Sequence, residues 1–182
     1  PDDAINQANN LGTISNTIQQ TGFTIDNPRD VDMFRFVVTA GQRVTFNINR
    51  PSGNFDSYIR LFNEQGTQLA SNDDGPTPGE AASFESYLDF TFNTAGTYFL
   101  SVSGYGNMTF DAITGDGDNV GSTGAYSLVV TPVTQTPPTD GSRILYMNFD
   151  GANISRSDLV RWAGNDWQGM VNYFDADQNG VT

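Results

Sequence analysis

Apolar and polar residues alternate with a period of two over much of residues 30–130, which is the pattern of half-buried β-strands. In the first such segment, Phe34, Phe36 and Val38 fall on one face. Similar segments follow at 44–48, 58–61, 67–71, 87–92, 98–102 and 126–130. Turn residues separate them, and helical periodicity is almost absent. The pattern predicts an all-β fold, an antiparallel jelly-roll-like β-sandwich.

The pattern changes towards the C-terminal end. Residues 133–142 are rich in Pro and Thr and lack apolar core positions, which indicates a linker. Residues 143–182 then combine a strand-like segment with apolar residues at helical spacing. We therefore expect a sandwich domain at 1–132, followed after the linker by a short α/β tail fragment of a second domain.

A long connection rich in Gly and Asp occupies residues 104–124. Connections of this length in a compact domain are usually functional or mobile. Four uncompensated carboxylates brought to one place would repel one another. We therefore expect weak order in this connection, with Asp116 and Asp118 kept apart from Asp73 and Asp74.

The composition excludes several kinds of catalytic site. The 182 residues include no Cys and no His, so a Ser-His-Asp triad, a Cys nucleophile and a His- or thiolate-bound metal cannot form within them. The net charge is −13, and all eight basic residues are Arg. Such a surface repels nucleic acids and anionic membranes and attracts cations. We expect no nucleic-acid partner and no membrane insertion, since no apolar run is long enough to span a bilayer.

Acidic residues form three candidate calcium sites, because Ca²⁺ prefers about six to eight oxygen ligands, several of them carboxylate. The first comprises Asp2 and Asp3 near the N-terminus, with Asp30 and Asp32 at the start of a strand. These four converge if the N-terminal segment folds back on the strand. The alternative is a set of solvated turn aspartates at a strand end.

The second candidate site lies in the sequence SNDDG, which contributes Asp73 and Asp74. Asp56, Glu85 and the acids of the long connection can add to it. Because this sequence is also an ordinary turn, a solvated turn and a calcium site both fit the pattern.

The third candidate site is the sequence DADQNG, which matches the opening of an EF-hand loop. Asp175, Asp177 and Asn179 occupy ligand positions 1, 3 and 5, and Gly180 supplies the sharp turn. The sequence ends at Thr182, before the bidentate acid that completes such a loop. We therefore expect weak calcium binding there.

Several motifs, in order, resemble a known family. The segments DVDMFRFVVTAGQRVTFNI, FDSYIRLFNEQGTQLASNDDG, FESYLDFTFNTAGTYFLSVSGYGN and GAYSLVV are similar to the bacterial pre-peptidase C-terminal domain, whose relatives include the collagen-binding domains of clostridial collagenases. The resemblance covers roughly residues 1–132. It implies a sandwich attached to secreted peptidases and usually without catalysis. In the collagen-binding relatives, an acidic N-terminal stretch and a D-x-D motif bind calcium, which implies this role for Asp2, Asp3, Asp30 and Asp32.

The tail resembles the entry segment of secreted bacterial proteases, metalloproteases among them. If so, the catalytic residues lie beyond Thr182. The leading hypothesis is therefore a non-catalytic accessory module of a secreted peptidase, which aids folding, secretion or attachment to an extracellular protein or polysaccharide, with calcium as a stiffening ion.

Two other functions fit parts of the sequence. A carbohydrate- or matrix-binding module would expose a flat row of aromatic side chains, for which Tyr58, Tyr87, Tyr98 and Tyr105 are candidates. Strand tyrosines more often pack with the hydroxyl at the rim. An enzyme that uses a pair of carboxylic acids, as in glycoside hydrolysis, is disfavoured because the chain has three Glu and most Asp lie in turns.

Overall fold

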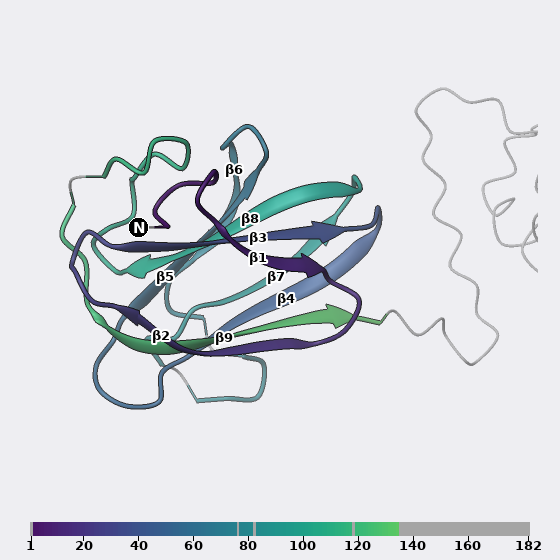
Figure 1. Ribbon diagram of the computed structural model, residues 1–182. Helices are drawn as coiled ribbons and strands as arrows, with labels where there is room; N and C mark the ends of the chain where they lie inside the picture. The colour runs from purple at the N-terminus through teal and green to yellow at the C-terminus, as the bar shows by residue number, and fades with distance from the viewer. Residues whose placement is uncertain (1, 76, 82, 118, 135–182) are drawn as a thin grey trace, which may run out of the picture. The chain divides into compact units, whose positions relative to one another are not determined.

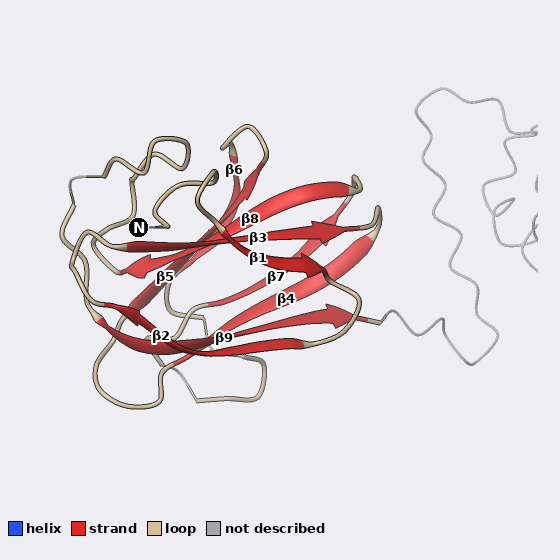
Figure 2. Ribbon diagram, in the orientation of Figure 1, coloured by secondary structure: helices blue, strands red, loops and turns tan. Residues whose placement is uncertain are grey.

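The computed structural model describes residues 2–75, 77–81, 83–117 and 119–134, which form nine strands and no helix (Figure 2). The strands are β1 (Asn9–Thr13), β2 (Ile18–Ile25), β3 (Val31–Val38), β4 (Gln42–Asn49), β5 (Ser57–Asn63), β6 (Gln68–Asn72), β7 (Tyr87–Phe92), β8 (Gly96–Gly104) and β9 (Gly124–Val133). One sheet has the order β1-β3-β8-β5-β6 and the other β2-β9-β4-β7. Figure 1 shows the two sheets as stacked layers, so the predicted β-sandwich is confirmed. The predicted α/β tail lies outside the described residues.

The main core fills the space between the two sheets, as the alternating pattern predicts. Its buried residues come from the inward positions of the strands and from two loop residues, and they are Ile14, Ile25, Phe34, Phe36, Val38, Val44, Phe46, Ile48, Phe55, Ile59, Leu61, Leu88, Phe92, Leu100, Val102, Tyr126, Leu128 and Val130. Each fully buried large apolar side chain contributes about 1.5–3 kcal/mol relative to exposure. This core therefore supplies most of the apolar burial that holds the sheets together.

A second, smaller core lies on the outer face of the five-stranded sheet. Val31 and Met33 of β3 point to this face because they alternate with the inward residues of the same strand. Phe110 and Ala112 of the long connection cover them, together with Ile5 of the N-terminal segment. The backbone N–H of Ile5 donates to the carbonyl of Ala112 at 2.9 Å, which ties the two covering segments together.

The weak order that we expected for residues 104–124 is therefore wrong for the described part of this connection. Phe110 is 2% exposed, and its burial anchors the middle of the connection to the sheet. Asp111 closes a tight turn, because its Oδ1 accepts hydrogen bonds from the backbone N–H groups of Ile113 and Thr114. A Gly- and Asp-rich composition did not reveal this order, because one buried aromatic side chain largely determines it.

The alternating pattern did not predict β1 and β2. Both are edge strands with mostly exposed or half-buried residues, and each contains a bulge. β1 pairs with β3 in parallel, whereas every other described strand pair is antiparallel. The parallel pairing places the N-terminal segment alongside the start of β3. It thereby positions the first group of acidic residues.

Candidate metal centre

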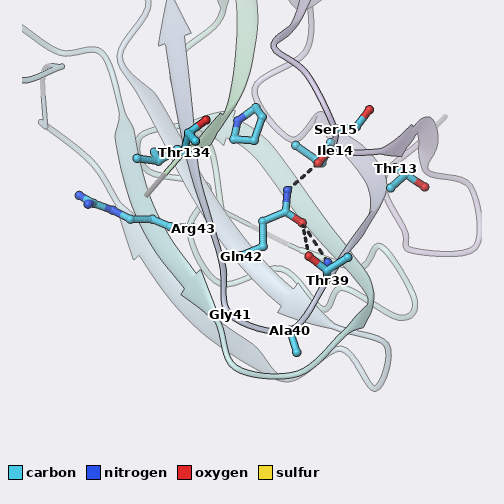
Figure 3. Close-up of a pocket in the computed structure, with 11 residues that line it drawn as sticks. Thr13, Ile14, Ser15, Thr39, Ala40, Gly41, Gln42, Arg43 and Thr134 are labelled. Atoms are coloured by element: carbon cyan, nitrogen blue, oxygen red, sulfur yellow. Dashed lines mark hydrogen bonds between the residues drawn. The ribbon is translucent and has the colours of Figure 1, made fainter. Parts of the chain in front are cut away.

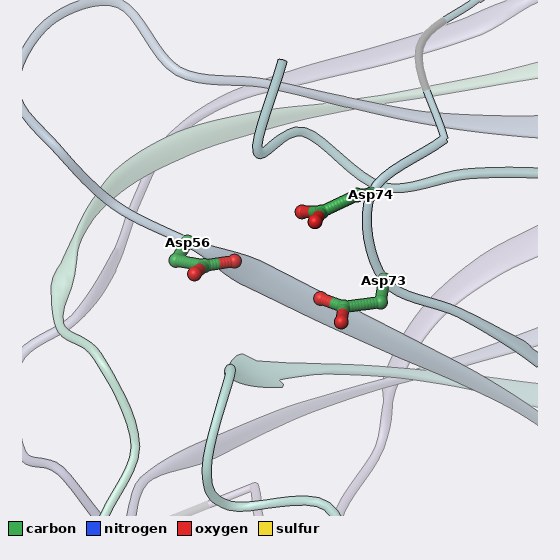
Figure 4. Close-up of side chains that lie close together, drawn as sticks. All are labelled: Asp56, Asp73 and Asp74. Carbon is green, nitrogen blue, oxygen red and sulfur yellow. The ribbon is translucent and has the colours of Figure 1, made fainter. Parts of the chain in front are cut away.

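Three aspartate carboxylates meet where β5 begins and β6 ends (Figure 4). Asp56 immediately precedes β5, and Asp73 and Asp74 immediately follow β6. Because β5 and β6 are antiparallel neighbours, the start of one and the end of the other lie at the same end of the sheet. One oxygen from each carboxylate lies within 4.8 Å of the other two. We call Asp56, Asp73 and Asp74 the aspartate trio. Among the described residues, it is the one group of three or more acids whose carboxylate oxygens lie within 4.8 Å of one another.

The aspartate trio is not neutralised by protein hydrogen bonds in the part of the chain that the structure describes. The Oδ1 atoms of Asp56 and Asp73 are shielded from solvent and have no hydrogen-bond partner. Burial raises the pKa of both carboxyl groups, and the charge of Asp74 raises both further. A buried carboxylate oxygen without a partner costs free energy, and so does its repulsion by like charges. The carboxylates therefore repel one another, and a bound cation would relieve this repulsion.

The nearby basic residue does not resolve this repulsion. Arg50 lowers the pKa of Asp56, but burial of Asp56 outweighs that effect. Arg50 lies 3.9 Å from Glu85, and its backbone N–H donates to the same Glu85 carboxylate at 2.8 Å. Glu85 is engaged in this way and does not belong to the aspartate trio. Glu85 still lies beside this turn, because its backbone carbonyl accepts a hydrogen bond from the N–H of Gly75 at 3.2 Å, but its carboxylate is directed to Arg50.

The donor chemistry of the trio fits a calcium ion. Three carboxylates offer up to six hard oxygen atoms, which Ca²⁺ prefers over nitrogen or sulfur ligands, and water can complete the set. The two buried, unpartnered Oδ1 atoms are ligand positions whose desolvation a cation would offset. Asp74 is exposed, so the site also has a route to solvent.

The first predicted site is also assembled in part, because the N-terminal segment folds back on the start of β3. The carbonyl of Asp2 accepts a hydrogen bond from the backbone N–H of Met33 at 3.0 Å. The Oδ1 of Asp3 accepts one from the backbone N–H of Val31 at 3.1 Å. These two bonds hold the N-terminal acids beside Asp30 and Asp32.

Each carboxylate of this N-terminal group already has a hydrogen-bond donor. Asn9 donates to Asp2, Tyr126 donates to Asp32, and the backbone N–H of Asp26 donates to Asp30. No three of the four acids bring carboxylate oxygens within 4.8 Å of one another. Calcium binding by Asp2, Asp3, Asp30 and Asp32 stays a prediction, and it would require these side chains to move closer together.

Asp32 reduces the repulsion among these four carboxyl groups through its raised pKa. It lies in register with Phe34 and Phe36 on the inward face of β3, where it is 8% exposed. Its pKa is raised to about 7: burial is the largest cause, the hydrogen bond from Tyr126 opposes it, and the charges of neighbouring aspartates add to the rise. Asp32 can therefore hold a proton near neutral pH, which removes one negative charge from the group.

The remaining candidates from the sequence lie elsewhere. Asp116 is outside the aspartate trio, and Asp118 lies outside the described residues. The EF-hand-like residues Asp175, Asp177 and Asn179 also lie outside the described residues, and their role in calcium binding stays a prediction.

The tyrosines proposed for ligand binding do not form a flat exposed row. Tyr58, Tyr87 and Tyr98 are half-buried, and Tyr105 is 47% exposed. Tyr98 packs against Phe92 at a ring distance of 4.6 Å, and its hydroxyl donates to the carbonyl of Thr94. This geometry favours packing with the hydroxyl at the rim.

A surface cavity of about 480 Å³ lies at the β3–β4 turn. Gln42 spans it, because its amide donates to the carbonyl of Ile14 and accepts hydrogen bonds from Thr39 (Figure 3). Arg43, which also lines the cavity, pairs with Asp89 at 2.7 Å. The polar groups of Gln42 and Arg43 are thus already engaged by protein partners.

Residues 30–104 match the family model of the bacterial pre-peptidase C-terminal domain, a non-catalytic domain. The resemblance seen in the sequence is therefore confirmed for this segment, which spans the start of β3 to the end of β8. Part of the chain is 33% identical, over 87 residues, to a probable subtilase-type serine protease of Deinococcus radiodurans. This alignment covers 46% of the chain and 11% of that relative's length. A subtilase-type relative does not support the metalloprotease that we considered for the parent.

Two solved structures are also similar to the chain. The pre-peptidase C-terminal domain of a collagenase from Bacillus anthracis has 20% sequence identity and a TM-score of 0.43, with coverage of 68% of this chain and 94% of that one. A periplasmic inhibitor of g-type lysozyme from Salmonella Typhimurium has 16% identity and a TM-score of 0.42, with coverage of 69% and 99%. The described part of the chain holds no helix long and apolar enough to cross a membrane.

Proposed function

We propose that this chain is a non-catalytic accessory module of an extracellular bacterial peptidase, and that it attaches the peptidase to a protein substrate. The observation that supports this most is the match of residues 30–104 to a domain type found in peptidases. The serine protease relative supports the same parent class. The absence of Cys and His leaves this chain without the nucleophile–base pairs of the common peptidases.

We further propose that calcium stabilises the module at the aspartate trio. Asp56, Asp73 and Asp74 supply clustered carboxylates, two of which have buried and unpartnered oxygen atoms. A second, weaker calcium site is proposed at Asp2, Asp3, Asp30 and Asp32, whose carboxylates have protein partners and stand further apart. A bound ion would offset the repulsion of the trio and fix the β6–β7 connection against the start of β5.

Co-sedimentation of the full chain with insoluble protein and polysaccharide fibres tests the attachment role. We expect the chain to pellet with insoluble collagen or elastin in millimolar calcium and to stay in solution with cellulose or chitin. Asp73→Asn should reduce the pelleted fraction in calcium, and Glu64→Gln, which removes an exposed charge from the β5–β6 turn, should not. Pelleting with a polysaccharide alone would favour the carbohydrate-binding alternative. Pelleting with none of the four would remove the attachment role and leave a role in folding or secretion.

A further inference from the structure

β7 is an edge strand that pairs with β4 alone among the described strands. The carbonyl of Ser86 accepts a backbone hydrogen bond from β4 at 3.0 Å, whereas the backbone N–H of Tyr87 donates away from β4 to the side chain of Asn72 at 3.2 Å. Because backbone groups alternate in direction along a strand, the N–H and C=O groups of Asp89 and Thr91 also face away from β4. Both residues are exposed. β7 therefore presents backbone donors and acceptors at the outer side of its sheet.

The other edge strands of the two described sheets have irregular pairing, and β7 does not. β1, β2 and β6 each pair with a neighbour through a shifted register, and such bulges hinder the addition of a further strand. The register of β4 and β7 runs without a shift over all six residues of β7. β7 also contains no Pro and no Gly, and its one charged side chain, Asp89, pairs with Arg43. β7 thus offers the regular edge that strand addition requires.

The inward face of β7 leaves one aromatic side chain incompletely covered. Phe90 packs against the main core, and its ring lies 4.9 Å from that of Phe92. Phe92 is completely buried, whereas Phe90 is half-buried. Val44 of β4 is opposite Phe90 on one side, and the free edge lies on the other. Opposed side chains on neighbouring strands lie about 4.5–5.5 Å apart, so an apolar side chain on an added strand would cover Phe90 further.

Charge determines which kind of strand fits this edge. The net charge of the chain is −13, and Asp73 and Asp74 directly follow Asn72, whose side chain accepts the N–H at the start of β7. Pairing of two copies through β7 would bring like charges together, which disfavours self-association. A cationic segment is attracted by the same field. The electrostatics therefore favour an extended basic peptide as the added strand.

We propose that β7 binds an extended cationic segment of a protein substrate by strand addition. The segment pairs its backbone with Asp89 and Thr91, places an apolar side chain beside Phe90, and carries Lys or Arg near the Tyr87 end. Strand addition of this kind rests on the proposed attachment to a protein substrate and specifies the form of that partner. Backbone pairing supplies affinity with little dependence on sequence, and the alternate side chains supply selectivity.

NMR titration of the full chain in chelator tests this proposal. The probe is a peptide of about nine residues in which Val alternates with Thr between two terminal Arg residues, a length typical of a strand. The amide signals of Asp89 and Thr91 should shift, and their hydrogen exchange should slow, because their N–H groups acquire acceptors. The amide of Phe90 faces β4 and serves as the internal reference, with an unchanged exchange rate.

Two control peptides separate charge from backbone pairing. One has Glu at both ends, and the other has N-methyl groups on two adjacent central residues, which removes a donor from each of its edges. Each should bind at least about five-fold more weakly than the probe, which corresponds to the loss of roughly one hydrogen bond or more.

Two substitutions at Thr91 separate backbone pairing from side-chain contact. Thr91→Pro removes an outward N–H without removing a bond to β4, and Pro is tolerated on edge strands. It should weaken binding of the probe by at least about five-fold. Thr91→Ala, the matched control, keeps the N–H and should bind as the unaltered chain does. If a thermal melt shows that Thr91→Pro does not fold, the exchange of Asp89 and Thr91 in the unaltered chain decides.

Several outcomes would overturn this inference. Signal changes confined to β1, β2 or β6, or equal binding of the N-methylated peptide, would show that β7 does not pair with the probe. Equal binding of the Glu peptide would overturn the choice of a cationic partner. A dimer of the full chain that Thr91→Pro abolishes in sedimentation would assign the edge to a second copy.

The peptide titration and the fibre test fail independently. If the chain pellets with collagen or elastin but does not bind the probe, the attachment role stands and strand addition at β7 is wrong. If the probe binds at β7 but the chain pellets with no fibre, strand addition stands and the attachment role is wrong.

Discussion

Asp32 and Asp73 each place a carboxyl group in a partly or fully buried position beside other carboxyl groups, yet their surroundings differ. Asp32 accepts a hydrogen bond from Tyr126, and its pKa of about 7 allows it to hold a proton near neutral pH. Asp73 has an Oδ1 that is shielded from solvent and lacks a hydrogen-bond partner among the described residues. The N-terminal group thus relieves its repulsion with protein hydrogen-bond donors and a raised pKa at Asp32, whereas two carboxylate oxygens of the aspartate trio have no hydrogen-bond donor within the described chain.

This difference reverses the ranking of the two sites that a family resemblance suggests. The family resemblance implies calcium binding at the N-terminal acids, but their oxygens are already engaged and are not gathered within a common 4.8 Å. The trio has an ordinary turn sequence and a geometry that suits a cation better. The free energy of an acidic cluster therefore depends on its unsatisfied oxygen atoms more than on its number of carboxylates.

The largest expected effect on stability comes from a substitution that removes the charge Asp32 acquires at high pH. The pKa of Asp32 is about 7 in the folded chain against 3.8 as the ordinary value, so the folded state keeps a proton that the unfolded state loses between these pH values. Stability in chelator should therefore fall as the pH rises from about 4 to about 7 and then level off. Asp32→Asn keeps an acceptor for Tyr126 and cannot ionise. We expect it to be more stable than the unaltered chain by roughly 3–4 kcal/mol at pH 8 and nearly equal to it at pH 4.

Urea unfolding followed by circular dichroism at several pH values, always in chelator, measures this difference. The comparison of the two proteins cancels the contributions of the other acids. Stability curves that run parallel from pH 4 to pH 8 would show that Asp32 ionises normally, and the contrast between the two acidic groups would lose its basis.

The next effect is the stabilisation of the chain by calcium. An ion that binds the folded state alone adds about 2.7 kcal/mol when its free concentration is 100 times Kd. We expect this gain in the unaltered chain and in Glu64→Gln, and we expect most of it to be lost in Asp73→Asn. Thermal melts with calcium and with chelator measure it. Equal gains in Asp73→Asn and in the unaltered chain would place the stabilising ion elsewhere.

A smaller effect compares the two acidic groups, because removing one carboxylate from each should change the stability of the chain in opposite directions. In chelator, Asp73→Ala removes a buried unpartnered oxygen and two like-charge repulsions, so stability should rise by about 0.5–1 kcal/mol. Asp3→Ala removes the acceptor for the backbone N–H of Val31, so stability should fall by about 1 kcal/mol. Urea unfolding at pH 7 gives both values. Two changes of the same sign would contradict the account.

The smallest effect concerns Asp116, which lies outside the aspartate trio. Its backbone carbonyl accepts from Asp111 and its backbone N–H donates to Thr114, so the turn does not depend on its carboxylate. Asp116→Asn should change the free energy of unfolding by less than about 0.5 kcal/mol, with calcium or without it. A loss above about 1.5 kcal/mol in calcium alone would reveal a ligand role for this residue.

The main core could be predicted from the sequence because it depends on local alternation. Phe34, Phe36 and Val38 share a face by the geometry of any strand, and burial follows once two sheets pack. The edge strands β1 and β2 could not be predicted in this way, because exposure and bulges remove the alternation. Their existence depends on neighbours that lie far away in the sequence.

In the acidic sites, too, the features that depend on residues far apart in the sequence could not be predicted. Alternation could have placed Asp32 on the inward face, since it lies two residues before Phe34. Its partner Tyr126 is 94 residues away, so neither its hydrogen bond nor its raised pKa could be predicted. Asp56 joins Asp73 and Asp74 because β5 pairs with β6, and a short hairpin turn indicates that pairing but not the distances between the carboxylates.

NMR chemical-shift mapping during a calcium titration of the full chain tests most directly whether the aspartate trio is the principal cation site. The account predicts that the earliest and largest changes occur at the backbone amides of Asp56 and of residues 72–75. Changes at residues 2–3 and 30–32 should follow at higher calcium or be smaller. A titration in which the N-terminal residues respond first, while Asp56, Asp73 and Asp74 stay unchanged, would contradict it.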